Sequence, residues 1–178
     1  MKTFASLLVA MIMISWWPAS LSNAKIPPVA HAALPQPPKY RIIERCSGIK
    51  ATAYYGPLKN QKRYSRKPNG QMRTYREEIR FQGEGIVTSS GVPPRICTIA
   101  VNKERFPHGT ILRLKQRAKD GHYETIFIGV AEDTGEDMIE NPNQIDLYMG
   151  KGELGLTRAE KFGARHGLVV EVIKEIRS

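Results

Sequence analysis

AEDTGEDMIENPNQIDLYMG, residues 131–150, is the stretch that decides the fold. It contains Asp133 in an Asp-Thr-Gly turn, shortly after the apolar segment over residues 125–130. Glycine adopts positive φ without a steric clash, and an Asp side chain can accept hydrogen bonds from nearby backbone amides. We therefore expect the chain to leave a strand and turn sharply at Asp133, and an Asx-turn is a sufficient structural explanation of this residue taken alone.

The second half of the stretch places Asp146 inside the segment Ile-Asp-Leu-Tyr. Strand alternation puts Asp146 and Tyr148 on one face, with Ile145 and Leu147 on the other. The intervening Asn-Pro-Asn, residues 141–143, can reverse the chain and bring both carboxyl groups together. A carboxyl group beside an apolar strand edge has a raised pKa, which suits a general acid. The alternative is a solvated strand face.

Three more acidic residues surround these two carboxyl groups: Glu132, Asp137 and Glu140. Their negative charges would raise the pKa of a buried Asp146 further by repulsion. They can also be ordinary solvated loop charges, and this is the favoured interpretation of Glu140.

Short apolar stretches bounded by Gly, Pro, Asn and Asp recur on both sides of residues 131–150. They are rich in Ile, Val, Tyr and Thr, which is typical of strands. The predicted strands are Ile49–Tyr55, Glu84–Thr88, Ile96–Val101, Thr110–Leu114, Tyr123–Val130, Ile145–Tyr148 and Leu168–Ile173. Residues 59–80 are rich in Lys, Arg, Asn and Gln and are predicted to form a long exposed insertion. Residues 157–166 are predicted to form a helix that Thr157 caps. This pattern favours a small, mainly β barrel.

The N-terminal residues have the pattern of an export signal. Lys2 precedes an apolar run over residues 4–17, and Ser-Asn-Ala at 22–24 offers a cleavage site. We expect a signal peptide over residues 1–24, a Pro-rich linker over 25–39 and one domain over 40–178, with a retained N-terminal anchor as the alternative. The net charge of +10 favours polyanionic partners, of which export makes nucleic acid the least expected.

The chain has two cysteines, Cys46 and Cys97. An even count in an exported chain favours a disulfide between them, and two buried free thiols are the alternative. The four histidines are scattered, without a Cys or His pair at ligand spacing. The sequence therefore predicts no metal site and no cofactor.

Six short segments between residues 51 and 173 carry a family resemblance when taken in order. They are residues 52–57 (TAYYGP), 88–91 (TSSG), 98–101 (TIAV), 106–110 (FPHGT), 131–135 (AEDTG) and 145–150 (IDLYMG). Together they resemble the three-aspartate (3D) domain family, the double-psi β-barrel module of membrane-bound lytic transglycosylase A and of small stationary-phase wall-lytic proteins. The resemblance implies a six-stranded double-psi β-barrel with one or two short helices.

The resemblance also implies an activity, a partner and a location. Such proteins cleave the β-1,4 bond between N-acetylmuramic acid and N-acetylglucosamine without water, leaving a 1,6-anhydro end. It assigns Asp146 as the single catalytic acid and base, with Asp133 beside it. The expected partner is a peptidoglycan glycan strand in the periplasm or cell wall, with no stable membrane insertion after cleavage of the signal. The oligomeric state stays open. The alternative on the same barrel is a wall-binding or wall-loosening module without catalysis.

Ligand contacts are expected from side chains near the two aspartates. The tyrosines could stack on sugar rings or pack in the core, and the hydroxyl residues could bind sugar or shape turns. The predicted substrate-binding residues are Tyr54, Tyr55, Ser89, Ser90, Asn102, Thr110, Thr134, Gly135 and Tyr148. Asn102 stands where the family has its first aspartate, which keeps hydrogen bonding but removes a charge. The connection between Asp133 and Asp146 is also two residues longer than in the family and more acidic.

Overall fold

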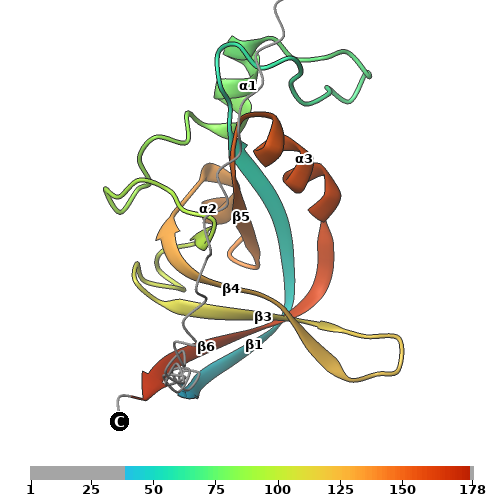
Figure 1. The fold of residues 1–178 in the computed structure, drawn as a ribbon. Coiled ribbons are helices and arrows are strands. Elements are labelled where there is room, and N and C mark those ends of the chain that lie inside the picture. The colour runs from blue at the N-terminus through green and yellow to red at the C-terminus, as the bar shows by residue number, and fades with distance from the viewer. Residues whose placement is uncertain (1–38, 177–178) are drawn as a thin grey trace, which may run out of the picture. The chain divides into compact units, whose positions relative to one another are not determined.

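The structure is a computed structural model that describes residues 39–176. The predicted signal peptide and residues 25–38 of the predicted linker lie outside the described residues. Within residues 39–176, six strands close into a barrel in the order β1-β5-β2-β4-β3-β6 (Figure 1). The strands are β1 (Lys39–Gly56), β2 (Thr98–Ala100), β3 (Ile111–Arg117), β4 (Tyr123–Asp133), β5 (Gln144–Lys151) and β6 (Arg165–Ile176). This confirms the predicted small, mainly β barrel.

Strand pairing fixes the surroundings of Asp146. β5 runs parallel to β1 on one side and antiparallel to β2 on the other. In this register Asp146 lies opposite Thr52 of β1 and Ala100 of β2. Asp146 therefore lies in the middle of the sheet. Its partners on the two neighbouring strands, Thr52 and Ala100, have short side chains, which leave space next to Asp146.

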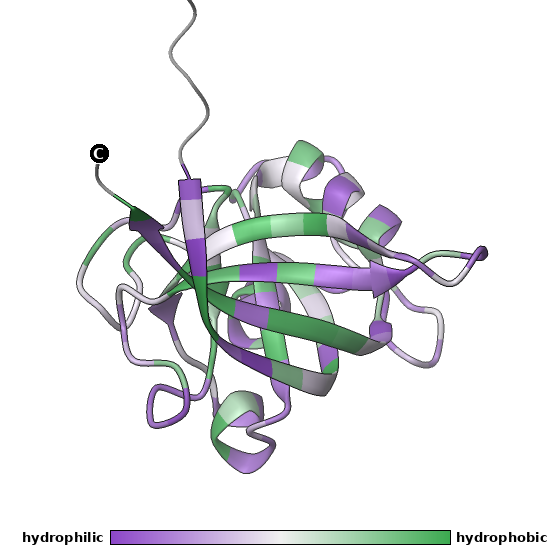
Figure 2. Ribbon diagram, turned by 90° about the horizontal axis from the view of Figure 1, so that it is seen from below, coloured by the Kyte–Doolittle hydropathy of each residue, from purple (hydrophilic) through white to green (hydrophobic). Residues whose placement is uncertain are grey.

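The barrel interior is filled by aliphatic side chains from every strand. The residues with no exposed surface include Ile49, Ile99, Leu112, Leu147 and Leu168. Figure 2 shows hydrophilic and hydrophobic residues alternating along several strands, as expected for strands with one face inside and one face in solvent. Burial of these side chains is the main favourable contribution to the stability of the barrel.

Three short helices connect the strands in the described residues: α1 (Tyr75–Gln82), α2 (Glu136–Glu140) and α3 (Gly152–Phe162). α3 begins five residues before the predicted helix, and Thr157 is not its cap. The Thr157 hydroxyl instead donates to the Glu153 carbonyl at 2.8 Å, one turn earlier. None of the helices in residues 39–176 is long and apolar enough to cross a bilayer.

The predicted strand over residues 84–88 does not form. Bends occupy residues 85–87, with Gly85 at φ +60°. The predicted exposed insertion over residues 59–80 contains most of α1. Its capping box was readable in the sequence: the Thr74 hydroxyl caps the Glu77 amide, and the Glu77 carboxylate accepts from the Thr74 amide.

The predicted disulfide is not formed, since Cys46 and Cys97 are both free. Cys46 lies on β1 opposite Val170 of β6, and Cys97 directly precedes β2. β5 separates β1 from β2 in the barrel. Because adjacent strands are about 4.8 Å apart, one intervening strand exceeds the Cα separation that a disulfide can bridge. The topology therefore does not allow the bridge that the predicted export would permit.

Candidate active site

A cavity of about 510 Å³ opens beside Asp146. Its walls come from β1, the end of α1 with the loop that follows it, β2, the end of β4, α2 and β5. The lining residues are Tyr54, Arg80, Phe81, Gln82, Gly83, Glu84, Gly85, Val87, Pro94, Ala100, Asp133, Thr134, Gly135, Glu136, Asp137, Met138 and Asp146. The two predicted catalytic aspartates and several of residues 80–87 therefore line the same cavity. The sequence analysis did not assign residues 80–87 to the site.

Asp146 is half-buried, and its Oδ1 atom is buried with no hydrogen-bond partner among the described residues. Burial, the largest cause, and the negative charges of Asp137 and Asp133 together raise the pKa of Asp146 to about 7. The nearby Thr52 hydroxyl and Leu147 amide act in the opposite direction but do not cancel the effect. Asp146 therefore keeps its proton to a higher pH than an ordinary aspartate, into the neutral range in which a general acid works best.

Asp133 is held in a different environment. Its Oδ2 accepts a hydrogen bond from the Tyr54 hydroxyl at 2.8 Å. Its Oδ1 accepts from the backbone amides of Ser89 and Thr134, both at 2.9 Å. All three contacts donate to the carboxyl group, so Asp133 is fixed in position as a hydrogen-bond acceptor. This confirms the prediction that the Asp133 side chain accepts hydrogen bonds from backbone amides at this turn.

The turn after Asp133 leads directly into the wall of the cavity. Gly135 begins α2 and accepts hydrogen bonds from the backbone amides of Met138 and Ile139 at 3.0 and 3.2 Å. Met138 is buried and packs in a cluster with Tyr54, Ala100 and Tyr148. This cluster lies next to the cavity. Packing of Met138 in the cluster therefore fixes the position of α2, including its acidic residues Glu136 and Asp137.

Two predicted ligand contacts, Thr134 and Gly135, line the cavity. The Thr134 hydroxyl is buried and has no hydrogen-bond partner among the described residues. It shares this property with Oδ1 of Asp146, another residue of the cavity lining. Buried polar atoms are almost always hydrogen-bonded, so these two atoms mark a position where water or a ligand would complete the site.

The three predicted tyrosines are buried rather than open for stacking. Tyr55 has no exposed surface and accepts a hydrogen bond from Gln61 through its hydroxyl at 3.0 Å. Tyr54 and Tyr148 are 8% and 2% exposed, and their ring centroids are 5.3 Å apart. Tyr54 alone lines the cavity, where its hydroxyl positions Asp133. The core-packing alternative therefore describes all three rings.

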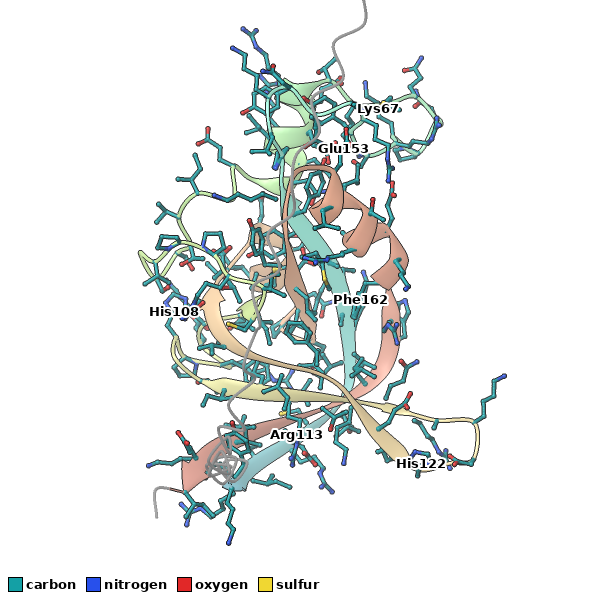
Figure 3. The ribbon with its side chains drawn as sticks, viewed as in Figure 1. Lys67, His108, Arg113, His122, Glu153 and Phe162 are labelled. Atoms are coloured by element: carbon teal, nitrogen blue, oxygen red, sulfur yellow. The ribbon has the colours of Figure 1, made fainter. Side chains whose placement is uncertain are left out.

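The serines lie on the loop before β2 and are not among the residues that line the cavity. The Ser89 hydroxyl is 3.2 Å from His108 Nε2, and the Ser90 hydroxyl is 2.9 Å from the Thr88 hydroxyl. Figure 3 places His108 at the side of the barrel, away from the β3–β4 hairpin that carries His122. Thr110 lies in a separate hollow and donates to the Pro107 carbonyl at 2.6 Å. The turn-forming alternative therefore accounts for the Thr110 hydroxyl.

Asn102 is buried and does not line the cavity. Its Nδ2 donates to the Met138 carbonyl at 3.2 Å, and its Oδ1 accepts from the amides of Glu104 and Arg105 at 3.0 and 3.2 Å. The side chain thus links the loop after β2 to α2. A direct substrate contact by Asn102, as predicted, does not fit this placement.

Most residues of the cavity wall were missed by sequence reasoning as parts of the site, and Arg80, Phe81 and Asp137 are among them. Arg80 and Phe81 end α1, whose capping box was the available signal. Asp137 had been treated only as a neighbouring charge. Among residues 39–176, no group of three His, Cys, Asp or Glu side chains is placed to hold a metal ion.

No protein-family model matches the chain, and no curated protein matches it. Solved structures of lytic transglycosylases overlap part of it. Escherichia coli MltA with bound chitohexaose is 25% identical over 54% of this chain and 30% of its own, with a TM-score of 0.40. The membrane-bound lytic murein transglycosylase of Agrobacterium tumefaciens is 18% identical over 50% and 25%, with a TM-score of 0.39. LtgG of Burkholderia pseudomallei is 23% identical over 52% and 28%, with a TM-score of 0.38.

This chain covers less than a third of the length of each of these structures. With TM-scores below 0.5, the overlap carries no conclusion about activity or substrate. Membership of the three-aspartate family stays a prediction from the sequence.

Proposed function

We propose that this protein cleaves peptidoglycan as a lytic transglycosylase, with Asp146 as the single catalytic acid and base. The observation that carries the proposal is the state of Asp146, whose pKa lies at about 7 and whose buried Oδ1 lacks a partner beside a cavity of about 510 Å³. A carboxyl group kept protonated near neutral pH is what protonation of a glycosidic oxygen requires.

The proposed reaction needs only this one group. Asp146 donates its proton to the oxygen that links N-acetylmuramic acid to N-acetylglucosamine, and the bond between this oxygen and the muramic C1 breaks. The oxygen of the muramic C6 hydroxyl then bonds to C1, and the Asp146 carboxylate takes the proton that this hydroxyl loses. The products are a 1,6-anhydromuramic end and a free 4-hydroxyl, and Asp146 returns to its protonated form. No water molecule is consumed.

Asp133 supports this reaction in two ways. Its negative charge contributes to the raised pKa of Asp146. We also propose that its negative charge, held in position by Tyr54 and two backbone amides, stabilises the positive charge that develops at C1 in an oxocarbenium-like transition state. Asp133 is therefore proposed as an electrostatic partner rather than as a proton donor.

The departure at Asn102 fits this proposal. The Asn102 amide donates to the Met138 carbonyl, a bond that an ionised carboxylate at this position could not make. The residue thus holds the cavity wall in place without facing the cavity. Asn102 in place of the family's aspartate therefore leaves the proposed acid, Asp146, and its proposed partner, Asp133, in place.

The proposed setting is the cell envelope, where the predicted signal peptide would deliver the protein to peptidoglycan. The net charge of +10 favours association with the anionic polymers of the wall. The non-catalytic wall-binding module is the competing function. It does not account for an unpartnered, protonated carboxyl group in a cavity, since binding alone has no use for it.

Digestion of purified peptidoglycan tests the proposal. The native protein should release fragments with 1,6-anhydromuramic ends, identified by mass spectrometry, and Asp146→Asn should release none. Glu140→Gln, a change at an exposed acid outside the cavity, is the control and should match the native protein. Reducing ends would indicate a hydrolase. Absence of products, with both proteins still sedimenting with the wall, would leave the binding module.

A further inference from the structure

Phe81 is unusual among the rings of this protein because it is exposed in a cavity. It lies in the last turn of α1, lines the cavity beside Asp146 and is 62% exposed. Large exposed apolar side chains in a concave site commonly mark a binding surface. Tyr54, the other ring of the cavity lining, is only 8% exposed.

The Phe81 ring is held on one side by an arginine. The Arg73 guanidinium carbon lies 3.9 Å from the ring centroid, in a cation–π contact. Arg73 is itself fixed, since its Nη1 donates to the Ser65 hydroxyl at 2.7 Å and to the Arg66 carbonyl at 2.6 Å. One ring face is therefore in contact with Arg73, and the 62% exposure of the side chain leaves much of the rest of the ring accessible.

The helix that carries Phe81 is anchored rather than loosely attached. Glu78 has no exposed surface and accepts hydrogen bonds from the Ser65 amide and hydroxyl at 3.1 and 2.9 Å. Lys67 forms an ion pair with Glu77 at 2.6 Å, and Figure 3 shows Lys67 on the segment that precedes α1. Phe81 is therefore presented in a defined orientation, which lowers the entropy cost of binding.

We propose that Phe81, backed by Arg73, is a sugar-stacking subsite that holds one N-acetylhexosamine ring of the glycan strand next to Asp146. The inference rests on the proposed function for its ligand class. A hexopyranose in the chair form has an apolar face of axial C–H groups, which an aromatic face covers favourably. Its rim of hydroxyl and amide groups suits the polar and acidic remainder of the lining.

An apolar partner, such as a lipid chain or a hydrophobic protein segment, is a poorer match for the same cavity. Five acidic residues and one arginine share the lining with Phe81, and each would lose hydration against an apolar ligand. A hydroxylated ring replaces that hydration with hydrogen bonds. The site therefore fits a carbohydrate with one face on Phe81 and its edge toward Asp133 and Asp146.

Binding can be measured apart from cleavage by using the full chain with Asp146→Asn. A hexamer of N-acetylglucosamine and soluble glycan strands are titrated by calorimetry, and the sugar C–H protons are followed by NMR. Phe81→Ala should weaken binding about tenfold, as expected when a ring no longer covers on the order of 50 Å² of apolar surface. Phe81→Trp should retain affinity.

Two further variants separate stacking from a general structural effect. Phe81→Leu keeps an apolar side chain but has no ring, so the upfield ring-current shifts of the sugar C–H protons should disappear. Leu154→Ala is the matched control, because Leu154 is 60% exposed on α3 and does not line the cavity. It should leave both affinity and shifts unchanged. Thermal unfolding of each variant shows that the fold is intact.

Unchanged affinity in Phe81→Ala would overturn the subsite, as would the absence of any sugar binding or equal loss in Leu154→Ala. These outcomes are distinct from failure of the proposed function. Phe81-dependent sugar binding by a protein that never cleaves peptidoglycan would uphold the subsite and reject the enzyme. Cleavage that is indifferent to Phe81 would uphold the enzyme and reject the subsite.

Discussion

Replacing Asp146 with asparagine should stabilise the protein at alkaline pH while abolishing its proposed activity. The pKa of Asp146 lies at about 7 in the folded protein, against an ordinary value of 3.8. The folded state therefore holds this proton over a pH range in which the unfolded chain has already lost it. Stability from this group is fully present below pH 4 and is lost as the pH rises through 7.

The size of the effect follows from the two pKa values. At about 1.4 kcal/mol for each pKa unit, ionised Asp146 reduces the free energy of unfolding by roughly 4 kcal/mol above pH 8. Asparagine carries no charge at any pH, so the variant escapes this loss. The difference in unfolding free energy between Asp146→Asn and the native protein should therefore grow by about that amount from pH 4 to pH 8.5.

Urea unfolding followed by circular dichroism at several pH values measures this difference. The comparison is made at constant ionic strength, because the charges of Asp133 and Asp137 contribute to the raised pKa. Glu140→Gln is the control, and its difference from the native protein should stay within about 0.5 kcal/mol throughout. A difference that is constant with pH, or that shrinks as the pH rises, would refute a raised pKa at Asp146.

Three other changes probe different parts of the structure. Glu171→Gln should lower the free energy of unfolding by about 3 kcal/mol near pH 7, because it breaks a buried carboxylate's pairing with two arginines. Burial alone would raise the pKa of Glu171, but these arginines lower it, so the deficit should shrink only at strongly acidic pH, measured by the same unfolding assay. Asn102→Ala should cost about 1–3 kcal/mol by leaving the Met138 carbonyl unpaired, with a matching fall in melting temperature. Arg80 supplies the only positive charge among the described residues of the cavity lining, so Arg80→Gln should weaken binding of peptide-bearing glycan strands two- to fivefold in calorimetry and leave neutral oligosaccharides unaffected.

Sequence patterns predicted the barrel because the apolar stretches of the sequence are short and separated by turn residues. The alternation in Ile-Asp-Leu-Tyr was sufficient to place Asp146 and Tyr148 on one face of β5. The same pattern could not say what covers that face. Tyr148 is 2% exposed because Tyr54 from β1 packs against it, and this neighbour is set by a parallel pairing between strands about 90 residues apart.

The wall formed by α1 shows a different limit. Residues 59–80 are rich in basic and amide side chains, and this composition indicates solvent exposure. Glu78 within α1 nevertheless has no exposed surface, because Ser65 supplies two donors to it. A buried carboxylate of this kind depends on a tertiary contact that composition does not encode. The contribution of Phe81 to the cavity was missed for the same reason.

The disulfide was predicted from compartment and cysteine count, neither of which contains information on strand order. Cys46 and Cys97 are on segments that β5 keeps apart. Strand order in a closed barrel is a global property, and the sequence analysis did not predict it. The pairing of two distant cysteines is therefore the kind of contact that a single sequence predicts least well.

The pH dependence of peptidoglycan cleavage tests the role of Asp146 most directly. Release of anhydromuramic ends is measured from pH 5 to pH 9 for the native protein, with Asp146→Asn alongside. Because Asp146 must be protonated to donate to the glycosidic oxygen, kcat/KM should fall as the pH rises through about 7, and the variant should be inactive throughout. Full activity at pH 9, or cleavage by Asp146→Asn, would contradict the proposal that Asp146 is the catalytic acid.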